Sequence, residues 1–138
     1  MAKDTLKRLA KYDIKPGTPV WLDVETYNTW TSTDRAVQVL TELAIDLTAA
    51  GYPVGIYAPP VHWFEITGNA NVGMPLWLAI GPYPDVESGV VAAKQACNKN
   101  TFGGKAPDMV QFVATVDGVA LDRNIICTSP VGLVAPTR

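Results

Sequence analysis

The sequence predicts an α/β domain in which a mostly parallel sheet is buried between helices or closed into a barrel. Short β-rich runs alternate with segments of helical periodicity, and several of the short runs are apolar on both faces. The chain has 138 residues, of which 48% are apolar and 17% charged. This composition suits one folded domain with a real core and excludes a disordered chain.

The expected elements follow in the order helix, strand, helix, strand, helix, strand, helix, strand, strand. The helix over 33–50 has clear end signals, because Ser32-Thr33-Asp34 offers capping oxygens and Gly51 can terminate it. The segment 61–67 reads as a short helix or a turn, and Gly89 weakens the start of the helix over 87–98. The other ranges are a helix over 4–12 and strands over 19–25, 53–58, 74–81, 108–114 and 119–122.

These elements predict one domain over residues 1–127, followed by an extended tail over 128–138 without periodicity. The net charge of −2 and the pI near 5.2 argue against nucleic acid as the main partner, because phosphate binding needs a basic field. A neutral or sugar-like ligand is compatible with this charge. No apolar run approaches the ~20 residues of a membrane span, and the N-terminal segment lacks the apolar stretch of a signal peptide.

The two cysteines, Cys97 and Cys127, allow two interpretations. They are either two buried free thiols or a disulfide that ties a helix to the C-terminal end of the chain. A disulfide would imply an oxidising compartment.

Two carboxylates stand at the end of the first predicted strand. Asp23 and Glu25 are two residues apart, so they project from the same face, with Cα atoms roughly 6.6 Å apart at a rise of ~3.3 Å per residue. Repulsion at this distance predicts that one acid keeps its proton to higher pH than the other. Such a pair is what glycosidic bond cleavage requires, at the strand end where α/β proteins place their sites. The alternative is a loop cap at Asp23 and a solvated Glu25.

A third acid, Asp122, ends the last predicted strand in "VALDRN" and is expected either at the same site or in a local contact with Arg123. Three carboxylates without histidine would also suit Mg²⁺ or Ca²⁺, although we expect no cofactor and no metal. Aromatic residues are dense at strand ends and in the following loops, where they either stack on sugar rings or pack in the core. They are Trp21, Tyr27, Trp30, Tyr57, Trp63 and Trp77.

Four segments of the chain, in order, resemble the second half of the glycoside hydrolase family 25 lysozyme fold and its actinobacterial relatives. An apolar strand ends in D-x-E at Asp23 and Glu25, and a later strand carries G-x-Y at Gly55 and Tyr57. Next come an L-W-x-A strand, a Q-F strand and a final D-x-N. These fall on Leu76, Trp77 and Ala79, on Gln111 and Phe112, and on Asp122 and Asn124.

The resemblance implies a (β/α)8-like barrel that cleaves the β-1,4 bond between N-acetylmuramic acid and N-acetylglucosamine in peptidoglycan. It implies Glu25 as the general acid, Asp23 as the carboxylate that orients or stabilises the reacting group, and Asp122 as a further residue of the site. The substrate-binding residues would be Tyr27, Tyr57, Trp77 and Gln111.

The family's barrel begins with about three strand–helix units before the D-x-E strand, whereas this chain has room there for one helix. About five strands with open edges cannot close into a barrel. We therefore expect the C-terminal part of a barrel, completed by a missing N-terminal segment or by another chain, with a homo-oligomer as one form of the second alternative. A remnant that binds without cleaving is the other interpretation. The resemblance places the protein outside the cell, in the cell envelope or in a phage particle.

Overall fold

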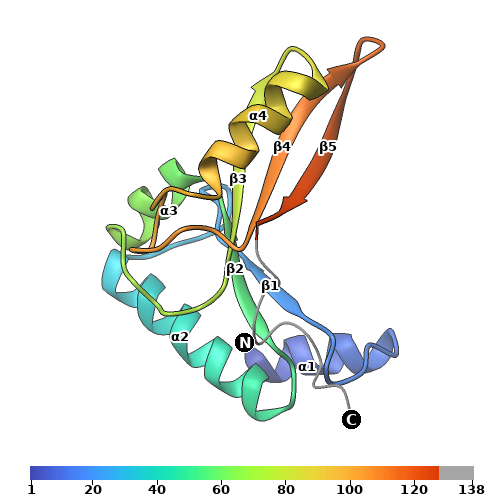
Figure 1. Ribbon diagram of the computed structural model, residues 1–138. Helices are drawn as coiled ribbons and strands as arrows, with labels where there is room; N and C mark the ends of the chain where they lie inside the picture. Colours follow the sequence, from blue (N-terminus) through green and yellow to red (C-terminus); the bar gives the residue numbers. More distant parts are fainter. Residues whose placement is uncertain (128–138) are drawn as a thin grey trace.

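The computed structural model describes residues 1–127, and the expected tail over 128–138 lies outside the described residues (Figure 1). The predicted order of elements is confirmed. The elements are α1 (Ala2–Lys11), β1 (Val20–Asp23), α2 (Thr33–Ala49), β2 (Val54–Ala58), α3 (Pro60–Thr67), β3 (Leu76–Tyr83), α4 (Val86–Ala96), β4 (Met109–Val116) and β5 (Val119–Ile126).

The strands form one five-stranded sheet in the order β1-β2-β3-β4-β5. β1 to β4 run parallel, each joined to the next by a helix, and β5 returns antiparallel to β4 through a tight hairpin. The α/β class and the mostly parallel sheet are therefore confirmed. The sheet is curled, and its first and last strands are edges within residues 1–127, so the chain forms a half-barrel.

The outer face of the sheet is covered by α2, α3 and α4 (Figure 1). Strand residues on this face alternate with those on the opposite face, and they are almost completely buried against the helices. The apolar side chains buried there include Leu22, Ile56, Leu78, Val110 and Phe112 from the sheet, with Leu40, Leu47, Trp63 and Ala93 from the helices. This helix-covered layer is the hydrophobic core of the chain.

The ends of α2 agree with the signals in the sequence. The Ser32 side chain accepts a hydrogen bond from the backbone N–H of Arg35 at 3.3 Å, and Gly51 follows the helix with φ of 91°. The segment after β2 is a helix, and Gly68 ends it in the left-handed conformation. No helix of residues 1–127 has the length and apolar character needed to cross a membrane.

Gly89 was expected to weaken the start of α4, yet it lies inside the helix and is buried. A Cβ at this position would lie 2.2 Å from Cδ2 of Phe112 on β4. Glycine therefore lets α4 approach the sheet closely, and packing against Phe112 outweighs the low helix propensity.

The last strand is longer than the sequence predicted. It was expected to end at Asp122 but extends to Ile126, because every residue from Val119 to Ile126 is in register with β4. Asp122 is therefore in the middle of an antiparallel strand and not at a strand end. The strand was predicted to end too early, because the polar residues 122–124 interrupt the apolar pattern of "VALDRNII".

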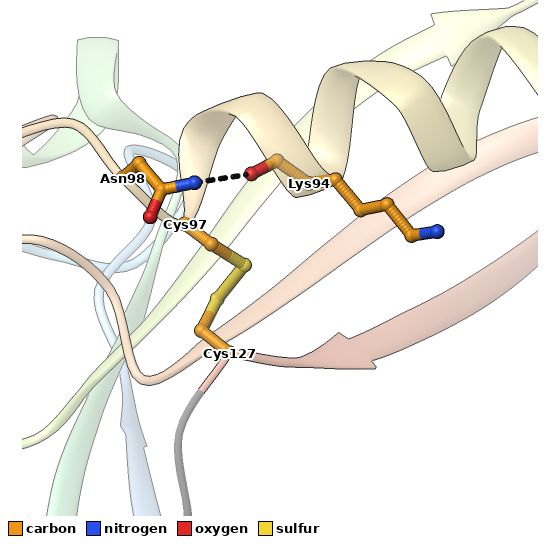
Figure 2. The surroundings of a disulfide bond; sticks show 4 residues. All are labelled: Lys94, Cys97, Asn98 and Cys127. Carbon is orange, nitrogen blue, oxygen red and sulfur yellow. Dashed lines mark hydrogen bonds between the residues drawn. A yellow bond between two sulfur atoms is a disulfide. The ribbon is translucent and has the colours of Figure 1, made fainter.

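Cys97 and Cys127 form a disulfide with a Cα–Cα distance of 5.3 Å. Cys97 follows the last turn of α4, and Cys127 follows β5, so the bond ties the end of the outermost helix to the end of the edge strand (Figure 2). The same turn is closed by Asn98, whose side-chain amide donates to the carbonyl oxygen of Lys94 at 3.2 Å. The disulfide interpretation of the two cysteines is the one that the structure shows.

Candidate functional site

The inner face of the curled sheet carries the strand residues Asp23, Tyr57, Trp77, Gln111 and Asp122 that the sequence singled out. Residues in register across strands project from the same face, and Asp23, Tyr57, Trp77, Met109 and Ile126 form one such row. Within residues 1–127 no helix covers this row, and the side chain of Ile126 is 65% exposed. The inner face is therefore open in this chain.

Two hydrogen bonds cross the inner face over an intervening strand. The hydroxyl of Tyr57 on β2 donates to Oε1 of Gln111 on β4 at 2.6 Å. The indole N–H of Trp77 on β3 donates to Oδ1 of Asn124 on β5 at 2.9 Å. The donor Tyr57 is in register with Met109 on β4, and the donor Trp77 with Ile126 on β5. Each acceptor lies two residues from that partner, toward the carboxyl ends of the parallel strands.

These contacts show a stagger of one residue per strand, which is the stagger of an eight-stranded barrel with a shear of eight. In such barrels alternate strands contribute the side chains of one layer. The strict register partner of Asp23 on β5, four strand junctions away, is Ile126. A stagger of one residue at each junction shifts this position by four residues, to Asp122. Asp23 and Asp122 thus belong to one level of the half-barrel, although Asp122 is not at a strand end.

The three aromatic side chains of the inner face form one cluster. The rings of Trp21 and Trp77 meet edge to face with centroids 5.4 Å apart, and those of Tyr57 and Trp77 do so at 5.1 Å. Trp21 lies over Gly55, where a Cβ would come within 2.3 Å of its ring. The cluster is half-buried, so its rings are partly available to a ligand.

Glu25 lies just past the end of β1, because the strand ends at Asp23 and not at residue 25 as predicted. The ladder continues for one bond, since the N–H of Val24 donates to the carbonyl oxygen of Tyr57 at 2.9 Å. The backbone carbonyl oxygen of Glu25 accepts two hydrogen bonds. It accepts from the Trp30 indole N–H at 2.9 Å and from the Asn28 backbone N–H at 3.1 Å. These bonds fix the backbone that carries the predicted acid.

Glu25 and Asp23 interact electrostatically. Burial, the charge of Asp23 and a side-chain hydrogen bond with Asp23 together raise the pKa of Glu25, and the nearby charge of His62 acts in the opposite direction. The pKa of the Tyr57 phenol is raised by burial and then by three carboxylates, Glu25, Asp23 and Asp122. The charges of all three predicted acids therefore act on the Tyr57 phenol.

Tyr27 differs from the other predicted binding residues. It lies on the loop after β1 and is 74% exposed, whereas Tyr57, Trp77 and Gln111 are joined by contacts across the sheet. The sequence did not predict that the side-chain amide of Asn28 donates to the carbonyl oxygen of Asp23 at 3.4 Å, that the Trp30 indole binds the backbone, or that His62 acts on Glu25. An asparagine in the loop that follows an acid pair is a signal that could have pointed to the first of these contacts.

A metal at this site finds no support in the geometry. Within residues 1–127, no three His, Cys, Asp or Glu side chains are grouped closely enough to hold an ion. The three carboxylates instead act through their charges on the pKa of the Tyr57 phenol. What this arrangement can do is hold one carboxylic acid protonated beside a carboxylate, next to an aromatic surface.

Comparisons with known proteins show which family the chain resembles. A family model described as "Lysozyme-like protein 1" matches residues 2–103, which is about three quarters of the chain. The chain is also 36% identical over 62 residues to "Probable GH family 25 lysozyme 2" of Dictyostelium discoideum. That match covers 44% of this chain and only 29% of the relative. No solved structure matches the chain at a significant level.

Proposed function

Because this chain belongs to the Lysozyme-like protein 1 family, we propose that it is a peptidoglycan-directed glycoside hydrolase domain of the N-acetylmuramidase type. Glu25 is the general acid, and Asp23 is the carboxylate that orients or stabilises the reacting group. The observation that carries this proposal is the raised pKa of Glu25 beside Asp23 at the carboxyl end of β1. An acid whose pKa is raised keeps its proton to higher pH and can donate it.

In the proposed reaction, Glu25 donates its proton to the glycosidic oxygen as the bond from that oxygen to the anomeric carbon breaks. Positive charge then develops on the sugar ring, and negative charge from Asp23 stabilises it. Asp122 lies at the level of Asp23 and adds to the negative potential of the inner face. A water molecule then bonds to the anomeric carbon and gives one proton to the Glu25 carboxylate, which restores the acid.

The glycan would lie on the aromatic cluster of the inner face. Tyr57 and Trp77 offer partly exposed ring faces, while Gln111 and Asn124 hold their polar ends. Tyr27 would contact the sugar from the loop above the acid pair. Restrained aromatic side chains bind a sugar at a lower entropic cost than mobile ones.

Turnover of purified peptidoglycan tests the hydrolase directly. We expect Glu25→Gln to lower the rate by about 10²–10⁴-fold, which is the usual contribution of a general acid. Glu87→Gln on α4 is the matched control, because it makes the same chemical change in the first turn of a helix on the outer side. The hydrolase proposal fails if wild-type protein, alone or assembled with a completing chain, releases no reducing sugar from any peptidoglycan.

A second candidate is a non-catalytic module that binds cell-wall glycan or serves as a structural part of an envelope or phage particle. The open half-barrel favours it, since the matched lysozyme is longer than the region it shares with this chain. The rest of the barrel would come from a missing N-terminal segment or from another chain. Sedimentation with purified cell walls that survives Glu25→Gln without turnover would support this candidate, and no sedimentation would eliminate it.

We place the protein in an extracellular, envelope or virion setting. The Cys97–Cys127 disulfide supports this proposal, because such bonds persist in oxidising environments. Thiol labelling of the protein taken from its native source tests it. Labelling of two free thiols after denaturation of this protein without reductant would contradict the proposed setting.

A further inference from the structure

Two side-chain amides stand next to each other on the inner face, on the neighbouring strands β4 and β5. Gln111 and Asn124 are direct register partners, which places their Cβ atoms roughly 4.5–5.5 Å apart. Both lie on the inner face, because the chain neighbours of Gln111, Val110 and Phe112, are buried beneath the helices. Asn124 is exposed and Gln111 is partly exposed, so a ligand on the inner face can reach the pair.

The contacts across the sheet fix how these two amides are oriented. The indole N–H of Trp77 can only donate, so its partner in Asn124 is the amide oxygen. The Tyr57 hydroxyl donates to the amide oxygen of Gln111. The hydrogen bonds of residues 1–127 leave both amide nitrogens without an acceptor, so two NH₂ groups remain for a ligand.

The next register pair on the same two strands adds an acceptor and an apolar side chain. Val113 and Asp122 are partners, and each lies two residues from a member of the amide pair, on the same face. Asp122 is exposed and Val113 is partly exposed. The four side chains therefore form a two-by-two block with two N–H donors, one carboxylate and one apolar group.

We propose that this block binds the acetamido group of an N-acetylated sugar, and that this group is the feature by which the inner face selects its glycan. The carbonyl oxygen of an acetamido group has two lone pairs and can accept from both amides. Its N–H can donate to Asp122, and its methyl group can pack against Val113. The inference rests on the proposed function, because it names the part of the sugar that the same site recognises.

Charge disfavours the other strong acceptors. A carboxylate or phosphate group would also suit two N–H donors. The charges of Asp23, Glu25 and Asp122 all act on the Tyr57 phenol of this face, and their negative potential repels an anion. A neutral carbonyl oxygen is therefore the favoured partner. A sugar hydroxyl is the nearest neutral competitor, yet it spans only part of the block and has no methyl group to place on Val113.

The test compares two neutral tetramers with the same β-1,4 backbone by isothermal titration calorimetry at pH 7. The tetramer of N-acetylglucosamine carries the acetamido group, and cellotetraose carries a hydroxyl in its place. We expect the wild type to bind the acetylated tetramer about tenfold more tightly or better, which corresponds to one or two net hydrogen bonds. Equal affinities would overturn the inference, whereas the hydrolase proposal is decided separately by turnover of peptidoglycan.

Two substitutions remove the donors and keep the oxygens. Asn124→Asp and Gln111→Glu retain an acceptor for Trp77 and Tyr57 but lose the NH₂ group. Each should lower the ratio of the two affinities about three- to tenfold. Asn100→Asp, at an exposed position in the loop after α4, makes the same chemical change and should leave the ratio unaltered.

Near-UV circular dichroism shows that each variant keeps its fold. A preference for the acetylated tetramer that survives both substitutions would overturn the role of the amides. A wild type that binds neither tetramer would overturn the inference as a whole, without any reference to the variants.

Discussion

The two faces of this sheet are built from the same strands and differ in nearly everything else. The outer face buries Leu22, Ile56, Leu78, Val110 and Phe112 to 7% exposure or less beneath three helices. The inner face carries carboxylates, amides and half-buried aromatic rings joined by hydrogen bonds across the curl. Fold stability therefore comes mainly from the outer face, while the inner face keeps polar and aromatic side chains partly accessible.

Truncation of one large residue on each face should give the largest difference in unfolding free energy between the two faces. Phe112→Ala on the outer face should lower the free energy of unfolding by about 3–5 kcal/mol, because the side chain is 1% exposed and would leave a cavity. Trp77→Ala on the inner face should cost less than about 2 kcal/mol, since Trp77 is only partly buried in the wild type. Urea denaturation measures both. Equal losses would contradict the division between the faces.

The disulfide fixes the edge strand that contributes Asp122 and Asn124 to the inner face. Replacing both cysteines by serine should lower the free energy of unfolding by about 2–4 kcal/mol, because a loop of sequence separation 30 is released in the unfolded chain. Denaturation with and without reductant measures this loss. The serine variant should not respond to reductant, and a wild type that does not respond would contradict the prediction.

Gly89 tests how closely the outer face is packed. Helix propensity alone predicts that Gly89→Ala stabilises the protein by up to about 1 kcal/mol. The new Cβ would lie 2.2 Å from the Phe112 ring, so we expect a net loss of about 1–3 kcal/mol instead. Val91→Ala, at an exposed position of the same helix, is the control. Thermal denaturation of Gly89→Ala shows whether the variant is less or more stable than the wild type. A more stable variant would contradict the close packing of Gly89 against Phe112.

The smallest expected effect is the pH dependence that Glu25 gives to stability. Its pKa in the folded chain lies above the ordinary value of 4.5, so folding favours the protonated form. The resulting stability is present below the unfolded pKa and is lost as pH rises through the folded pKa. Glu25→Gln should therefore melt slightly higher than wild type at pH 7, with the gap closing below about pH 4.5. A gap that widens on acidification would contradict the raised pKa.

Periodicity and end signals predicted the order of elements, because the outer face imposes its apolar pattern on every strand and on α2. The boundary of β5 was missed, since its inner residues Asp122 and Asn124 are polar and its pairing partner lies across a hairpin. The acid pair was found because D-x-E follows an apolar strand. The cross-strand contacts of Tyr57 and Trp77 depend on the curl and stagger of the sheet, which no local pattern reveals.

Binding of peptidoglycan glycan to the proposed site on the inner face is tested most directly by backbone amide and indole chemical shifts during titration with a soluble peptidoglycan fragment. We expect shifts at Trp21, Tyr57, Trp77 and Gln111 and at the loop that carries Glu25, while Phe112, Ala93 and Leu47 stay unchanged. Shifts confined to the helix-covered face, or no saturable shift at all, would contradict it.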